Sequence, residues 1–218
     1  DLESICTEYV SLSPQVHSQI GGTCYANAAA TILRATESRI IGRKVKSHQQ
    51  EVNKIVSKWG SNGDVSGWNV LKDECSKRHL GISRINLSQA EAALLRGRPL
   101  YARFNLDNAQ WERWSSFFKS NPNKPIQRKD VGADMTENRE ITGHAIVICG
   151  RSDKYWKFKN SWGQWADNGY ARIAKNAVNF SYYDVYFRTC DLSQMDLDNY
   201  QKYNPQKCTA ICLSLIHI

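Results

Sequence analysis

Apolar side chains recur at helical spacing through the first part of the chain, up to about residue 97. The segments 24–40, 48–59 and 67–79 each repeat apolar positions three or four residues apart, and a glycine follows the second and third segments. Residues 88–91, SQAE, have the form of a capping box and predict one more short helix. The pattern therefore indicates a mainly helical first region.

From Leu100 onward the spacing changes to the alternation that is typical of strands. Apolar and polar residues alternate over 100–106, and later segments have the same character. A helix is predicted at 109–119. The polar stretch 119–142 is interpreted as a long loop near the cleft or as a surface excursion, and the second interpretation is preferred. The expected strands are 100–106, 144–149, 154–159, 170–173 and 182–188.

A helical region followed by a strand-rich region predicts an α+β fold class and not an alternating α/β one. We expect one domain of two lobes, a mainly helical lobe at residues 1–92 and a β-rich, barrel-like lobe at 93–212, with a cleft between them. The chain begins with Asp1 and not with Met, so upstream sequence such as a signal or pro-segment is expected. Residues 213–218, LSLIHI, are interpreted as a non-native tail.

The composition narrows the class of protein. The chain has 218 residues, of which 41% are hydrophobic and 23% charged, as is typical of a soluble globular protein. Its apolar stretches fall well short of the roughly 18 residues of a membrane span. The net charge of +8 is spread along the chain without a long run of like charges. We therefore expect neither a membrane nor a nucleic-acid partner.

The cysteines follow neither a metal-binding nor a disulfide pattern. There are 7, an odd number, without a CxxC pair or a cluster at zinc spacing. We therefore expect neither a metal ion nor another cofactor, and a disulfide framework is not indicated. Cys75 and Cys149 lie on apolar faces and are predicted to be buried thiols. Cys208 and Cys212 pair with each other or with nothing.

One thiol stands where a helix is predicted to begin. Cys24 follows Gly21, Gly22 and Thr23 and precedes an alanine-rich segment. The free N–H groups and the positive dipole end of a helix N-terminus stabilise a thiolate, so the pKa of this thiol is expected to fall. Taken alone, a cysteine at such a position is more often an ordinary core residue.

The β-rich region supplies a base and an orienting group for such a nucleophile. His144 opens a predicted strand directly after Gly143, and Asn160 ends the next strand. Neighbouring antiparallel strands can bring the two side chains together, and an amide oxygen beside the imidazole fixes its tautomer. Taken singly, a core histidine and a turn asparagine are the ordinary interpretations. Their combination with Cys24 favours catalysis.

These segments resemble the papain-like cysteine peptidases. The similarity rests on Gln19 followed by CYA at 24–26, on GHA at 143–145, on NSWG at 160–163 and on DNGYARI at 167–173. The resemblance implies a papain-like two-lobe fold in which Cys24 and His144 form a thiolate–imidazolium pair and Asn160 orients the imidazole. It also implies that Gln19 and the Cys24 backbone N–H hold the oxyanion.

The same resemblance implies where a substrate would lie. The expected contacts flank Cys24 and His144 and include part of the turn at 61–68. These contact residues are Gly22, Thr23, Asp64, Val65, Gly143 and Trp162. Trp162 is also expected to cover the side-chain amide of Asn160.

The sequence departs from the usual pattern of that family in several places. The glutamine usually stands six residues before the cysteine, whereas here Gln19 stands five before it and Ser18 takes the sixth position. Either residue is a candidate for the oxyanion site, and Gln19 is preferred. Gly21 replaces the usual cysteine three residues before the nucleophile, and the usual Cys-Asn-Gly-Gly element is absent. The usual disulfides of the helical lobe therefore cannot form.

The predicted function is thiol-dependent hydrolysis of peptide bonds through an acyl-enzyme, in the manner of an endopeptidase. An acyl transferase or ligase with the same residues and a catalytically silent peptide-binding module are the alternatives. The expected partners are a peptide or protein substrate and a propeptide or protein inhibitor in the cleft, and a monomer is expected. The resemblance implies a lysosomal, vacuolar or secreted location, and the missing cysteines leave a cytosolic one open.

Overall fold

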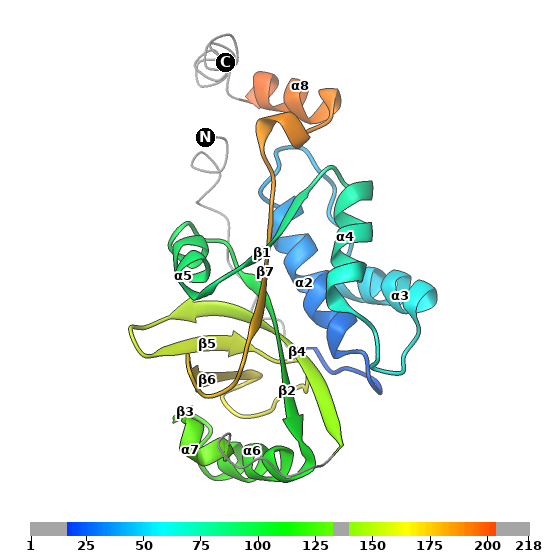
Figure 1. Cartoon of the computed structure of the whole chain (residues 1–218). Coiled ribbons are helices and arrows are strands. Elements are labelled where there is room, and N and C mark those ends of the chain that lie inside the picture. The colour runs from blue at the N-terminus through cyan, green and yellow to red at the C-terminus, as the bar shows by residue number, and fades with distance from the viewer. Residues whose placement is uncertain (1–16, 133–139, 204–218) are drawn as a thin grey trace.

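The computed structural model describes residues 17–132 and 140–203. In Figure 1, helices α2, α3 and α4 stand together on one side of a long sheet, while α6 and α7 lie at one end of it and α8 at the other. The α-helices are α2 (Cys24–Glu37), α3 (His48–Trp59), α4 (Gly67–Lys77), α5 (Leu87–Leu95), α6 (Asn108–Ser120), α7 (Arg128–Val131) and α8 (Gln194–Tyr203). The strands are β1 (Gly81–Ile85), β2 (Leu100–Asp107), β3 (Pro125–Ile126), β4 (Ile141–Arg151), β5 (Tyr155–Lys159), β6 (Tyr170–Ala174) and β7 (Ser181–Tyr186). The predicted α+β class is confirmed.

Side-chain caps fix where several helices begin. Ser47 caps α3 and exchanges hydrogen bonds with Gln50, so the helix predicted at 48–59 begins and ends where expected. The capping box predicted at 88–91 is wrong, because Asn86 and Gln89 exchange these hydrogen bonds and α5 starts at Leu87. Asparagine caps as well as serine does, and glutamine returns the bond as glutamate would. The pair Asn86 and Gln89 therefore sets where α5 begins, two residues before the predicted pair.

The strands form one open sheet of 7 strands in the order β1-β7-β2-β4-β5-β6-β3. Neighbours are antiparallel except β3 and β6. Because β1 and β3 are the two edges, the sheet does not close, and the expected barrel-like lobe is wrong in this respect. Strand β1 was not predicted either, since its only neighbour is β7, about a hundred residues further along the chain.

Two cores lie on opposite faces of this sheet, and β4 contributes to both. Ala145 and Val147 join the core beneath α2, α3 and α4, whereas Ile146 and Ile148 join the core that contains the aromatic face of α6. This is the alternation that a strand buried on both faces requires. The fully buried alanines of α2 let the helix approach the sheet closely, so Cys24 at its first residue lies against β4.

The predicted surface excursion at 119–142 is wrong for its first part. Ile126 on β3 and Val131 on α7 are fully buried, and both belong to the core on the α6 side. Residues 133–139 lie outside the described residues, as do Asp1, Cys208, Cys212 and the segment 213–218. Cys75 is fully buried as predicted, whereas Cys149 is only half-buried; both are free thiols.

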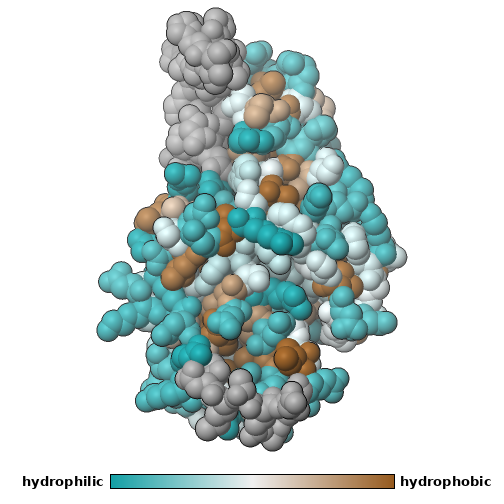
Figure 2. All heavy atoms as spheres, in the orientation of Figure 1, coloured by the Kyte–Doolittle hydropathy of each residue, from teal (hydrophilic) through white to brown (hydrophobic). Residues whose placement is uncertain are grey.

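The surface view in Figure 2 shows a mainly hydrophilic face on which hydrophobic residues form separate small groups. Such scattered apolar exposure is normal for a globular surface. Of the helices that the structure describes, none has the length and apolar character needed to cross a bilayer.

Candidate active site

A cleft of about 600 Å³ lies where the N-terminal end of α2 meets strands β2 and β4. One wall is the turn 62–66 and the other is the start of β4. The cleft brings together residues that are far apart in the sequence. Its lining includes Gln19, Gly22, Cys24, Asp64, Val65, Arg103, Trp111, Glu140, Gly143, His144 and Trp162.

Cys24 is the first residue of α2, and the side chain of the preceding Thr23 makes no cap to the helix. The thiol is 7% exposed. Burial raises its pKa, and this effect outweighs the opposing influence of hydrogen bonds with the backbone of Ala145 and Tyr25 and of the Arg103 charge. The expected lowering of the pKa of this thiol is therefore wrong for the free protein, because the helix start is covered and not open to water.

His144 lies on β4, opposite Phe104 of β2, and is almost completely buried. Its Nε2 lies 2.9 Å from Asn160 Oδ1. The same oxygen accepts the backbone N–H of Ser161 at 2.9 Å, which identifies it as the amide oxygen. His144 therefore donates from Nε2 and keeps Nδ1 as a proton acceptor. Burial lowers the pKa of His144 to about 4, with the Asn160 bond acting in the opposite direction.

Three aromatic rings surround the His144 imidazole. The Trp162 ring lies 4.8 Å from it, Trp111 lies 5.6 Å away and Phe104 5.8 Å away, the last two edge-on. These contacts fix the plane of the imidazole and exclude water from its Nε2 side. Within the described residues the imidazole is bonded to Asn160 and not to the Cys24 thiol.

Gln19 is anchored at the edge of the cleft by three hydrogen bonds. Its backbone N–H donates to the Ser161 carbonyl at 2.7 Å, its Oε1 accepts the Ser161 hydroxyl at 2.6 Å, and its Nε2 donates to Gly21 O at 2.8 Å. One amide hydrogen of Nε2 is left for another acceptor. Ser18 instead forms a bridge with Trp162 and does not line the cleft. Of the two candidates for the oxyanion site, Gln19 is the one that lines the cleft together with Cys24.

Most of the expected substrate contacts line the cleft, namely Gly22, Asp64, Val65, Gly143 and Trp162. Thr23 does not, because it is buried and its hydroxyl donates to the Ile20 carbonyl at 2.9 Å. Gly22 packs against the turn, since a Cβ there would lie 2.6 Å from Gly63 N. A close approach of two backbones therefore shapes this wall.

Sequence reasoning missed other residues of the cleft, chiefly Arg103, Trp111 and Glu140. The available signal was the alternation of β2, which puts Arg103 on the same face as Tyr101. Which face of β2 meets α2 depends on the pairing of β2 with β4, and that pairing is not visible in the sequence.

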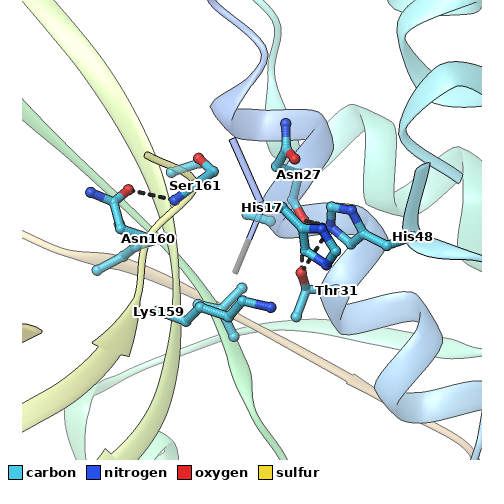
Figure 3. A pocket seen from close by; sticks show the side chains of 11 residues that line it. His17, Asn27, Thr31, His48, Lys159, Asn160 and Ser161 are labelled. Carbon is cyan, nitrogen blue, oxygen red and sulfur yellow. Dashed lines mark hydrogen bonds between the residues drawn. The ribbon is translucent and has the colours of Figure 1, made fainter. Parts of the chain in front are cut away.

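A second, much smaller cavity of about 10 Å³ is lined in part by Asn160, whose side chain bonds His144 of the active-site cleft. Here the rings of His17 and His48 are stacked, with centroids 3.6 Å apart, and Lys159 extends from β5 toward the pair (Figure 3). His48 Nε2 lies 3.3 Å from both Asn27 O and Thr31 Oγ1. The stack ties the segment that carries Gln19 to α3.

Burial is the main cause that lowers the pKa of both histidines in this cluster, to about 4 for His17 and to about 3 for His48. The positive charges of Lys159 and Arg34 act in the same direction. Both rings are therefore neutral near pH 7. The described residues contain no cluster of three or more histidine, cysteine or acidic side chains that could hold a metal ion.

Comparison with known proteins adds to this geometry. A model described as "Papain family cysteine protease" matches residues 126–196, a segment that holds His144 and Asn160. A "Cathepsin L-like" protein of Caenorhabditis elegans is 23% identical over 188 residues, covering 72% of this chain and 54% of that protein. The chain thus spans about half the length of the curated relative it matches.

Solved structures similar to the chain include a proCathepsin B and a cysteine protease. The proCathepsin B S9 of Trypanosoma congolense has a TM-score of 0.52 at 12% identity, covering 77% of this chain and 70% of that one. The protease CMS1MS2 of Carica candamarcensis, solved in complex with E-64, has a TM-score of 0.45 at 16% identity, covering 79% and 93%. The first likeness shows a shared fold.

The chain is papain-like in its fold and in its sequence, and these findings support a cysteine peptidase. Such an enzyme belongs to the hydrolase class, and the predicted resemblance to papain-like cysteine peptidases is confirmed.

Proposed function

We propose that the chain is an endopeptidase that hydrolyses peptide bonds through an acyl-enzyme formed on Cys24. The observation that carries this proposal is the 2.9 Å contact between His144 Nε2 and Asn160 Oδ1. It leaves Nδ1 of the imidazole as a base in the cleft that also holds the thiol. A nucleophile, a base and an orienting group are the three roles that covalent catalysis needs.

In the proposed reaction, His144 Nδ1 takes the proton of the Cys24 thiol as the sulfur attacks the peptide carbonyl. The imidazolium then gives that proton to the leaving amine, and the C–N bond breaks to leave a thioester. Water attacks the thioester, losing one proton to His144, and the acid product leaves as Cys24 regains its proton. The imidazole ends each cycle neutral.

The carbonyl oxygen becomes negatively charged in both tetrahedral intermediates and needs donors. We assign this role to the Cys24 backbone N–H and to the Gln19 Nε2 hydrogen that points away from Gly21. Gln19 suits this role because its side-chain Oε1 and its backbone N–H are both already bonded to Ser161. These two bonds fix the side-chain amide before substrate binds.

The free protein has a neutral thiol and a neutral imidazole, since burial raises the pKa of Cys24 and lowers that of His144. Proton transfer therefore accompanies the attack and does not precede it. The missing thiol–imidazole bond in the free protein is compatible with this role, because catalytic hydrogen bonds often tighten only when substrate binds.

The test uses peptides blocked at both ends, so that only internal cleavage is seen. We expect the protein to cleave a pool of such peptides and the Cys24→Ala variant to lose about three orders of magnitude or more in kcat. Cys190→Ala removes an exposed free thiol and serves as the matched control, with unchanged activity expected. Near-normal turnover by Cys24→Ala contradicts the proposal.

A second measurement separates hydrolysis from the alternatives. A peptidyl epoxide should add its mass to Cys24 and leave Cys190 unmodified. In the presence of a millimolar amine nucleophile, the products should remain mainly acids. Mainly amide products indicate an acyl transferase, and peptide binding without any cleavage indicates a silent binding module.

A further inference from the structure

One arginine stands inside the active-site cleft. Arg103 lies on β2 directly opposite Ala145 in the strand register, and it lines the cleft together with Cys24 and His144. Apart from the imidazole, it is the one basic side chain among the described residues of the cleft lining. Its charge reaches the reaction centre, since it lowers the pKa of the Cys24 thiol against the larger effect of burial.

The guanidinium of Arg103 lies against Gly143 on the neighbouring strand. A Cβ added at Gly143 would lie 2.8 Å from Arg103 Nη2 and 3.1 Å from its Nε. The guanidinium therefore occupies the space that a side chain at position 143 would take, directly before His144. The cation thus lies at the residue before His144, in the wall of the cleft.

The charge of Arg103 is not neutralised within the described part of the chain. The buried Arg98, by contrast, binds the Asp184 carboxylate at 2.8 Å. Arg103 forms no such ion pair with any described residue, although Asp64 and Glu140 line the same cleft. An exposed guanidinium beside a reactive thiol is therefore available to a charged group of the substrate.

We propose that Arg103 is a specificity-determining residue that binds a carboxylate of the substrate, so that peptides with Asp or Glu beside the cleaved bond are preferred. This inference rests on the proposed peptidase function. A guanidinium matches a carboxylate with two parallel hydrogen bonds, a geometry that lysine does not reproduce. Asp64 and Glu140 repel acidic side chains at other positions, which confines the preference to the one that reaches Arg103.

The experiment measures kcat/KM for paired quenched peptides that differ only by Glu or Gln, placed in turn at each position around the cleaved bond. We expect the wild-type protein to prefer Glu over Gln by about 10- to 100-fold at one position, as a charged hydrogen bond would give. Arg103→Ala should abolish this preference, and Arg103→Glu should prefer Lys there. Arg151→Ala removes an exposed arginine at the far end of β4 and should keep it.

The possible outcomes separate this inference from the proposed function. If no blocked peptide is cleaved by the wild-type protein, the peptidase proposal fails and the inference fails with it. If peptides are cleaved but Glu and Gln are equal at every position, or Arg103→Ala keeps the preference, the inference alone is overturned. The inference is also overturned if Arg103→Ala lowers the rate equally for Glu and Gln peptides and shifts the pH profile, because Arg103 then acts on the Cys24 thiol.

Discussion

The Asn160 side-chain oxygen accepts two hydrogen bonds at once, from His144 Nε2 and from the backbone N–H of Ser161, each at 2.9 Å. Since a backbone N–H can only donate, this arrangement fixes the orientation of the amide, and the amide in turn fixes the tautomer of the imidazole. In the proposed mechanism Asn160 is therefore a positioning residue that keeps Nδ1 free of its proton. Its effect on catalysis should pass entirely through His144.

Replacing Asn160 should lower the rate without abolishing it. In Asn160→Ala the imidazole loses its one hydrogen-bond partner among the described residues and can adopt the other tautomer, so we expect kcat to fall by about 10- to 100-fold with little change in KM. Asn160→Asp places a negative charge beside the ring and should raise the pKa of His144, moving the acid limb of the rate profile to higher pH. Asn176→Ala, at an exposed position, is the control.

The oxyanion assignment is tested by replacing Gln19 and Ser18 with alanine in two separate variants. Gln19→Ala removes a donor that is held in place by Ser161, and we expect kcat to fall by about 10²- to 10³-fold. Ser18→Ala should leave kcat within about twofold, because Ser18 pairs with Trp162 and lies outside the cleft lining. Steady-state kinetics on one blocked peptide decide between them, and the reverse ranking would show that Ser18 is the donor.

The sequence could indicate the fold class and the candidate residues because these depend on local signals. Helix α3 has its own cap and its own stop, so its bounds could be predicted from the sequence. Cys24, His144 and Asn160 stood out by residue type beside predicted element ends. In the structure Cys24 and His144 line one cleft and Asn160, directly after β5, bonds His144; their catalytic roles stay predictions.

What the sequence could not indicate depends on contacts between distant segments. The open sheet and the strand β1 follow from the pairing of β1 with β7, and no local pattern encodes that pairing. The direction of the Cys24 pKa shift was missed for the same reason. The dipole argument applies to an exposed helix start, whereas β4 covers this one and burial becomes the larger effect.

The pH dependence of the rate should be bell-shaped with a broad plateau. Activity needs one proton shared by the pair: a neutral His144 to accept it and a Cys24 thiol to supply it. Because burial lowers the pKa of His144 to about 4 and raises that of Cys24 above its ordinary value, activity should fall below about pH 4 and, on the alkaline side, only above the range in which an ordinary thiol ionises. The readout is kcat/KM across pH. An alkaline limb well below pH 9 would instead support the thiolate–imidazolium pair expected from the sequence.

The stacked pair of His17 and His48 should make the protein less stable in acid. An unfolded histidine takes up its proton near pH 6.5, whereas the folded pair, beside Lys159 and Arg34, does so only near pH 4 and pH 3. Between these values the unfolded state binds more protons, so the free energy of unfolding decreases as the pH falls from 6.5 toward 3. His144, with its pKa lowered to about 4, adds to the same slope.

Urea unfolding at intervals from pH 7.5 to pH 4 measures this slope. We expect the stability of the wild-type protein to be nearly constant above pH 6.5 and to fall steadily below it. The double variant His17→Gln/His48→Gln keeps side chains that can hydrogen-bond but cannot take up protons in this range, so its stability should fall less steeply, with only the His144 contribution remaining from these three residues. His79→Asn, at an exposed position outside the cluster, should keep the wild-type slope. Equal slopes for the double variant and the wild-type protein would mean that the stacked pair takes up protons at the same pH folded and unfolded, and the cluster would then have no part in the acid sensitivity.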